Sequence, residues 1–139
     1  MNKILEYNVN DLYEGMVENF EFVVTNQMME NFSELSGDFN PLHINTEYAI
    51  SKGFEGSVVY GGILITQISK IIGMYMPGNN SLWSGLSINF LNPLMINQKA
   101  SIDATVVHIS EATSSFKLNI RILYDEITVL KGSADIIIL

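Results

Sequence analysis

The stretch Gly61-Gly-Ile-Leu-Ile-Thr-Gln-Ile-Ser-Lys-Ile-Ile-Gly-Met-Tyr-Met76 decides the fold of this 139-residue chain. Its apolar side chains surround almost the whole circumference of a helix, and its few polar positions are Thr66, Gln67, Ser69 and Lys70. A helix that is apolar nearly all round lies buried in the middle of its domain. Pro77 and Gly78 follow directly and end it. We therefore predict a long central helix around which the rest of the chain folds.

The chain that follows this helix has the pattern of β-strands. Within residues 115–124, apolar Phe116, Leu118 and Ile120 alternate with polar neighbours, which is the period of a strand with one buried face. Similar runs predict four strands, at residues 81–91, 100–109, 115–124 and 127–138. Long strands joined by short loops predict an antiparallel meander.

The chain before the helix is mixed. Residues 19–24 alternate as a strand, and Thr25 is a good N-cap for a helix that runs to about residue 35 and ends at Gly37. Residues 36–60 are predicted to be irregular, with a short helix after Asn45 or Thr46. The sequence therefore predicts a single α+β domain over residues 1–139, with a long central helix wrapped by a curved antiparallel sheet.

Composition excludes several functions. The net charge is −8 with only seven lysines and arginines, so no basic stripe is available for nucleic acid. The chain has no cysteine, which excludes disulfides, thiol nucleophiles and thiolate metal sites. The mean hydropathy of +0.23 is high for a small monomer, and we expect a homodimer that covers apolar surface.

No stretch of the sequence reaches the apolar length of a transmembrane helix. The first residues also lack the apolar run of a secretory signal. We therefore expect no membrane partner and a cytoplasmic location.

The segment Leu35-Ser-Gly-Asp-Phe-Asn-Pro-Leu-His43 carries the chemistry. Gly37 and Pro41 restrict the backbone, and the resulting stiff loop presents the Asp38 carboxylate and the His43 imidazole five positions apart. Such a pair can act as general acid and base if both groups reach one reacting atom. Two other interpretations stay open: Asp38 as a turn former, and His43 as a satisfied structural residue. A metal site is not expected, because the other histidine, His108, lies on a predicted strand far along the chain.

A second candidate feature is Tyr60-Gly61-Gly62, directly before the central helix. Backbone N–H groups at a helix N-terminus lack partners and favour a developing negative charge. The two glycines allow a substrate carbonyl to approach the backbone closely. The alternative is a tight loop-to-helix turn that binds nothing.

Together these motifs resemble the MaoC-like family of (R)-specific enoyl-CoA hydratases and dehydratases. The resemblance extends over most of the chain, through Leu35 to His43, Ala49, Gly53-Phe54, Gly61, Met76-Pro-Gly78, Ser81-Leu-Trp83 and Asn89-Phe-Leu-Asn-Pro93. It implies a hot-dog fold, paired protomers with an acyl tunnel near their interface, and a lyase of fatty-acid metabolism that uses no cofactor or metal.

The resemblance also implies roles for individual residues. Asp38 and His43 match the catalytic pair, which positions and activates one water for attack at Cβ and delivers a proton to Cα. Gly61 matches the amide that holds the thioester carbonyl. The remaining candidates at the substrate site are Asn40, Tyr60, Gly62 and, as a hydrogen-bonding support, Ser69.

Two positions depart from the family pattern. Tyr60 stands where the family has histidine, and tyrosine is bulkier and titrates near pH 10 rather than 6.5. Gly62 replaces a larger apolar residue. These changes bear on the shape of the pocket and therefore on the substrate class.

The leading hypothesis is an (R)-3-hydroxyacyl-thioester dehydratase or enoyl-thioester hydratase, with an acyl-CoA substrate favoured slightly over an acyl-carrier-protein thioester. The alternatives are a hot-dog thioesterase, a related hydro-lyase acting on another biosynthetic acyl intermediate, and a catalytically silent binding module. A thioesterase could use Asp38, but that chemistry gives His43 no role at this spacing.

Overall fold

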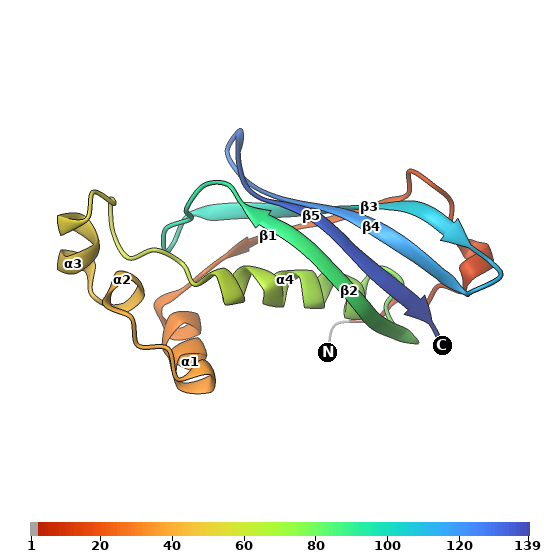
Figure 1. Ribbon diagram of the computed structural model, residues 1–139, viewed down its shortest axis with the longest axis horizontal. Helices are drawn as coiled ribbons and strands as arrows, with labels where there is room; N and C mark the ends of the chain where they lie inside the picture. Colours follow the sequence, from red (N-terminus) through yellow and green to blue (C-terminus); the bar gives the residue numbers. More distant parts are fainter. Residues whose placement is uncertain (1–2) are drawn as a thin grey trace.

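The computed structural model describes residues 3–139 and confirms the predicted α+β architecture. Helix α4 (Gly61–Met74) lies in the hollow of a five-stranded antiparallel sheet that curves around it, as Figure 1 shows. The strands are β1 (Val17–Val23), β2 (Ser81–Phe90), β3 (Lys99–Ser110), β4 (Ser115–Tyr124) and β5 (Ile127–Ile138). Their bounds lie within two residues of the predicted ones.

The strand order, β1-β3-β4-β5-β2, corrects one prediction. The meander holds for β3, β4 and β5, but β2 does not lie beside β3. It pairs with β5 at the far edge of the sheet, with Ser81 opposite Ile138 and Phe90 opposite Leu130. The alternation of apolar residues sets which face a strand buries but not which strand lies next to it, so the pattern could not place β2.

The core lies between α4 and the inner face of the sheet. Ile68 and Ile71 of α4 are fully buried, as are Leu118 and Ile122 of β4. The helix is not buried all round, however, which corrects the sequence prediction. Its opposite face, including Thr66, Ser69 and Lys70, is exposed, because in a single chain the sheet covers only one side of α4.

Three helices gather at the end of the molecule where α4 begins (Figure 1). They are α1 (Asn26–Ser36), α2 (Pro41–Ile44) and α3 (Thr46–Ser51), and a short 3₁₀ turn at Val9–Asp11 precedes β1. The Thr25 cap of α1 and the Gly37 terminator, whose φ is 74°, are as predicted. Helix α3 is capped by Asn45, also as predicted, whereas α2 was not predicted. No helix within residues 3–139 has the length and apolar character needed to cross a membrane.

Candidate active site

The loop that carries Asp38 is held by its own side chains. The Asp38 N–H donates to Ser36 Oγ at 3.1 Å, and Asp38 Oδ1 accepts from the Asn40 N–H at 3.0 Å. Asn40 Oδ1 in turn accepts from the Leu42 N–H at 3.0 Å, so Asn40 caps α2, with Pro41 at its first position. Asp38 is thus a turn former, and its exposed carboxylate still has Oδ2 free of these bonds. The predicted stiffness of the loop follows from this chain of short-range hydrogen bonds.

The His43 ring is fixed by one strong contact. Its Nδ1 lies 2.7 Å from the carbonyl oxygen of Val58. Because a carbonyl can only accept, Nδ1 carries the proton and donates, which leaves Nε2 with a free lone pair in the neutral ring. The Val58 N–H donates to Leu42 O at 3.1 Å, so α2 and Val58 are joined twice. Nε2 makes no hydrogen bond within residues 3–139 and can accept or return a proton.

Tyr60 connects the loop of Asp38 to His43. Its side chain is only 2% exposed. The His43 ring stacks on the Tyr60 ring with centroids 4.1 Å apart and an interplanar angle of 27°, while the Tyr60 hydroxyl donates to the backbone carbonyl of Asp38 at 2.5 Å. Burial, and then the negative charge of Asp38, raise the pKa of Tyr60 above its usual value of about 10. The phenol therefore remains a neutral donor around neutral pH.

The first backbone N–H groups of α4 lack acceptors within residues 3–139. Tyr60 occupies the N-cap position without a side-chain cap bond, and the N–H groups of Gly61 and Gly62 donate to no acceptor among the described residues. A cavity of about 420 Å³ begins at Gly61. Its lining is mostly apolar and includes Phe54, Val58, Leu64, Phe90 and Leu94. Val58 thus lines the cavity, and its carbonyl accepts the hydrogen bond from His43.

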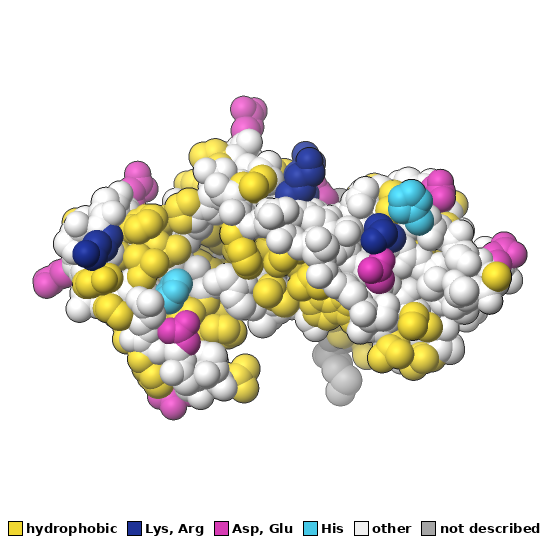
Figure 2. All heavy atoms as spheres, in the orientation of Figure 1, with side chains coloured by type: hydrophobic (Ala, Val, Ile, Leu, Met, Phe, Trp, Pro, Cys, Tyr) yellow, Lys and Arg dark blue, Asp and Glu magenta, His cyan; other side chains and the backbone are white. Residues whose placement is uncertain are grey.

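The surface around this end of the molecule is hydrophobic. In Figure 2, hydrophobic side chains gather between the helical end and the sheet, and one imidazole and an acidic side chain lie among them. The Phe90 ring packs against Gly61, because a Cβ at this position would lie only 3.0 Å from that ring.

Gly62 makes room for a neighbouring side chain and does not leave its backbone open to a substrate. A Cβ at this position would lie 2.3 Å from Cζ of Phe32, whose ring also packs on Tyr60 with centroids 4.7 Å apart. Phe32, on α1, therefore covers the second residue of α4. Tyr60 and Gly62 therefore both lie against this one aromatic side chain.

We expect Gly62→Ala to destabilise the fold by about 1 to 3 kcal/mol, the usual cost of overpacking, because Phe32 must move. Urea unfolding measures the change. Gly73→Ala is the matched control: it lies in the same helix with nothing within 4 Å of the added Cβ, and we expect it to stabilise the fold by about 1 kcal/mol. If Phe32→Leu restores the stability lost in Gly62→Ala, the contact is supported. If Gly62→Ala lowers the free energy of unfolding equally in the wild-type and Phe32→Leu proteins, the contact is contradicted.

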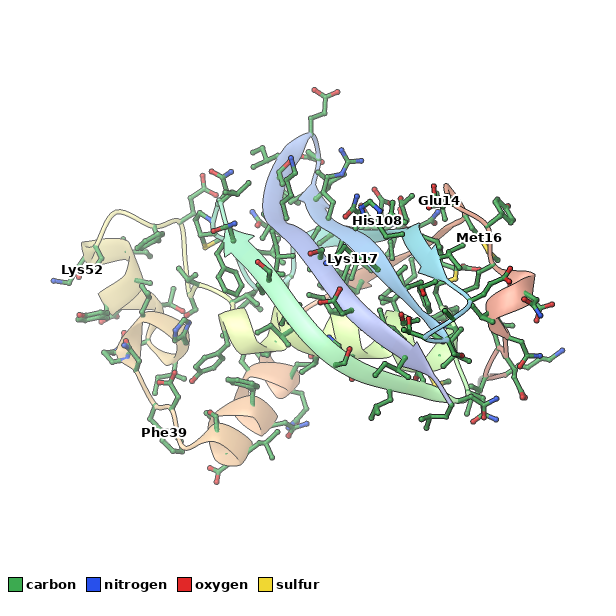
Figure 3. All side chains as sticks on the ribbon, turned by 45° about the vertical axis from the view of Figure 1, so that its right-hand side comes forward. Glu14, Met16, Phe39, Lys52, His108 and Lys117 are labelled. Atoms are coloured by element: carbon green, nitrogen blue, oxygen red, sulfur yellow. The ribbon has the colours of Figure 1, made fainter. Side chains whose placement is uncertain are left out.

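Other predicted residues lie apart from this cluster. Ser69 is exposed on α4 and makes no side-chain hydrogen bond to Asp38, His43 or Tyr60. Figure 3 places His108 on the sheet, at the opposite end of the molecule from Phe39 in the Asp38 loop. Residues 3–139 contain no group of three or more His, Asp or Glu side chains arranged to hold a metal ion.

Val58, Phe32 and Phe90 were not predicted as parts of the site. Val58 acts through its backbone carbonyl, and the two phenylalanines come from α1 and β2, at sites that only the folded chain brings to the start of α4.

A curved antiparallel sheet around one long helix, with a carboxylate and an imidazole at the amino end of that helix, defines a hot-dog protein of the hydratase and dehydratase class. The fold matches the (R)-hydratase of Aeromonas caviae with a TM-score of 0.88 and 26% identity, over 92% of this chain and 98% of the other. The chain belongs to the MaoC-like domain family, whose model matches residues 12–126.

Two relatives are named for different thioester carriers, coenzyme A and acyl-carrier protein. The chain is 32% identical over 91 residues to an (R)-specific enoyl-CoA hydratase of Aeromonas caviae, a region that covers 66% of this chain and 68% of the relative. It is 25% identical over 120 residues to a mitochondrial 3-hydroxyacyl-[acyl-carrier-protein] dehydratase of Arabidopsis thaliana, covering 84% and 71%.

Proposed function

We propose that this protein is a hydro-lyase that adds water to, or removes it from, the α,β bond of an acyl thioester, with Asp38 and His43 as its acid–base pair. One observation carries the proposal. Tyr60 contacts both the Asp38 backbone and the His43 ring. The next residue, Gly61, is the first residue of α4 and lines an apolar cavity. A stiff carboxylate, a free Nε2 and an unpartnered amide are the groups that this reaction needs.

In the hydration direction, Asp38 and His43 hold one water beside Cβ of the enoyl thioester. As the water oxygen forms its bond to Cβ, one water proton passes to the pair, and a proton is delivered to Cα. The electron pair of the double bond moves toward the thioester carbonyl, and the Gly61 N–H stabilises the negative charge that develops on its oxygen. Dehydration runs through the same steps in reverse.

We propose a coenzyme A thioester, trans-2-enoyl-CoA or (R)-3-hydroxyacyl-CoA, as the substrate. The similarity to an (R)-specific enoyl-CoA hydratase supports it. The net charge of −8 disfavours docking of a strongly acidic carrier protein without a local basic patch, but it also repels the phosphates of coenzyme A, so the charge does not separate the two carriers. The carrier-protein thioester remains the competing form, as the Arabidopsis relative illustrates.

The test follows crotonyl-CoA by the loss of its enoyl absorbance, with free thiol measured in the same sample. We expect absorbance to fall with no thiol release, and the product to be the (R)-3-hydroxyacyl thioester. Thiol release at the same rate would identify a thioesterase, and no change in either signal would contradict the proposal. The same assay with crotonyl-carrier protein compares the two carriers.

We also propose a homodimer. Strand β2 is an edge strand. Exposed apolar side chains lie along it and directly after it, each 38 to 53% exposed: Leu82, Leu86, Phe90 and Leu91. Such a surface is typical of an interface. We expect sedimentation equilibrium to give twice the chain mass of 15.5 kDa, and Leu86→Lys to shift the protein toward monomer. A monomer at micromolar concentration would contradict this assembly.

We also propose a cytoplasmic location, which cell fractionation tests.

A further inference from the structure

We propose that Tyr60 is a positioning residue, whose hydroxyl and ring together hold Asp38 and His43 against one reacting oxygen. The inference rests on the proposed function and assigns Tyr60 a role other than contact with substrate.

The hydroxyl of Tyr60 fixes the backbone of the residue that carries the carboxylate. It donates to the Asp38 carbonyl at 2.5 Å, across 22 positions of the sequence. The hydrogen bonds among Ser36, Asp38, Asn40 and Leu42 join residues two apart and shape the turn. The attachments to Val58 are made further along, at Leu42 and His43 of α2, so the Tyr60 hydroxyl is the long-range hydrogen bond at Asp38 itself. Tyr60 is 2% exposed, so its hydroxyl anchors an exposed loop to a buried side chain. A hydroxyl committed in this way does not face a substrate carbonyl.

The ring of Tyr60 restricts the imidazole. Stacking at 4.1 Å and 27° sets the plane of the His43 ring, while the Nδ1 bond to Val58 O, at 2.7 Å, sets its rotation within that plane. Together the two contacts leave Nε2 one direction in which to point. Pre-organisation of this kind raises the rate, because the catalytic group does not lose rotational freedom during the reaction.

Phe32 also packs on the ring of Tyr60. Its ring lies 4.7 Å from the Tyr60 ring at 43°, in the space that Gly62 leaves open. The stack Phe32–Tyr60–His43 therefore runs from α1 to α2 over the first residues of α4. A larger residue at position 62 would displace Phe32 and loosen its packing on Tyr60.

The experiment compares Tyr60→Phe with the wild-type protein in crotonyl-CoA hydration. The variant keeps the stacked ring and loses the bond to Asp38 O. We expect kcat to fall about tenfold, the effect of one hydrogen bond of typical net strength, with KM changed less than twofold. Tyr75→Phe is the control, because Tyr75 packs on Phe20 at the far end of α4, and we expect wild-type kinetics. A wild-type kcat for Tyr60→Phe, or a loss confined to KM, overturns the inference.

Amide hydrogen exchange tests the same point without activity. In Tyr60→Phe we expect faster exchange at Asp38 and Asn40, and unchanged exchange in β4 and β5. Unchanged exchange at both loop amides overturns the inference. If the wild-type protein fails to hydrate the thioester, the proposed function fails, and the exchange data still decide whether Tyr60 holds the loop.

Discussion

Replacing His43 with alanine is expected to lower kcat for crotonyl-CoA hydration by about a hundredfold to ten-thousandfold, the usual contribution of a general acid–base group. The Nδ1 bond to Val58 O fixes the tautomer, so Nε2 is the atom that we propose exchanges protons with the reacting water. Because the proposal assigns substrate binding mainly to the Gly61 amide and the apolar cavity, we expect KM to change much less than kcat. Steady-state kinetics on purified variants measure both.

His108→Ala is the control for this experiment. His108 is the other histidine of the chain and lies exposed on β3, away from the helical end (Figure 3). We expect it to keep wild-type kinetics. If His43→Ala retains kcat while it remains folded, or if His108→Ala loses as much, His43 is not the acid–base group.

The second large effect is expected for Asp38→Asn. Asparagine keeps an oxygen that can accept the Asn40 N–H, so the turn survives while the negative charge is lost. We expect kcat to fall by about a hundredfold to ten-thousandfold, with the urea midpoint of unfolding unchanged. The matched control is Asp103→Asn, which removes an exposed ion pair with Arg121 on the sheet, 3.2 Å long, and should leave kcat as it is.

The two catalytic changes are also expected to be non-additive. If Asp38 and His43 act on the same water, removal of either group disables the step. The kcat of the double variant is then little lower than that of the less active single variant. Effects that multiply would show that the two residues act independently, which contradicts a shared reacting oxygen. The comparison needs only the kcat values of the two single variants and the double variant.

Much of the fold was predictable because local signals agree with the tertiary structure. The apolar residues from Ile63 to Ile72 mark α4, and Thr25 and Gly37 mark the ends of α1 by their capping chemistry. The edge position of β2 was not predictable, because strand neighbours depend on the path of the chain around α4. Helix α2 was missed, although Asn40 and Pro41 are a cap and a first helical residue, because four residues show no hydrophobic period.

The candidate site was predictable only in part. Asp38, His43 and Gly61 follow from a motif with a specific spacing, and the structure connects the first two through Tyr60. Tyr60 itself was placed at the substrate, because the sequence does not reveal that its hydroxyl turns to the Asp38 carbonyl. The support for His43 comes from the Val58 carbonyl, and a backbone acceptor leaves no mark in a sequence.

A crystal structure of the protein with bound (R)-3-hydroxybutyryl-CoA tests the shared reacting oxygen most directly. We expect the hydroxyl at C3 to lie within about 2.6 to 3.2 Å of both His43 Nε2 and an Asp38 carboxylate oxygen, with the thioester oxygen at the Gly61 N–H. A ligand whose C3 hydroxyl reaches only one of the two side chains, or that lies away from the start of α4, would contradict the account.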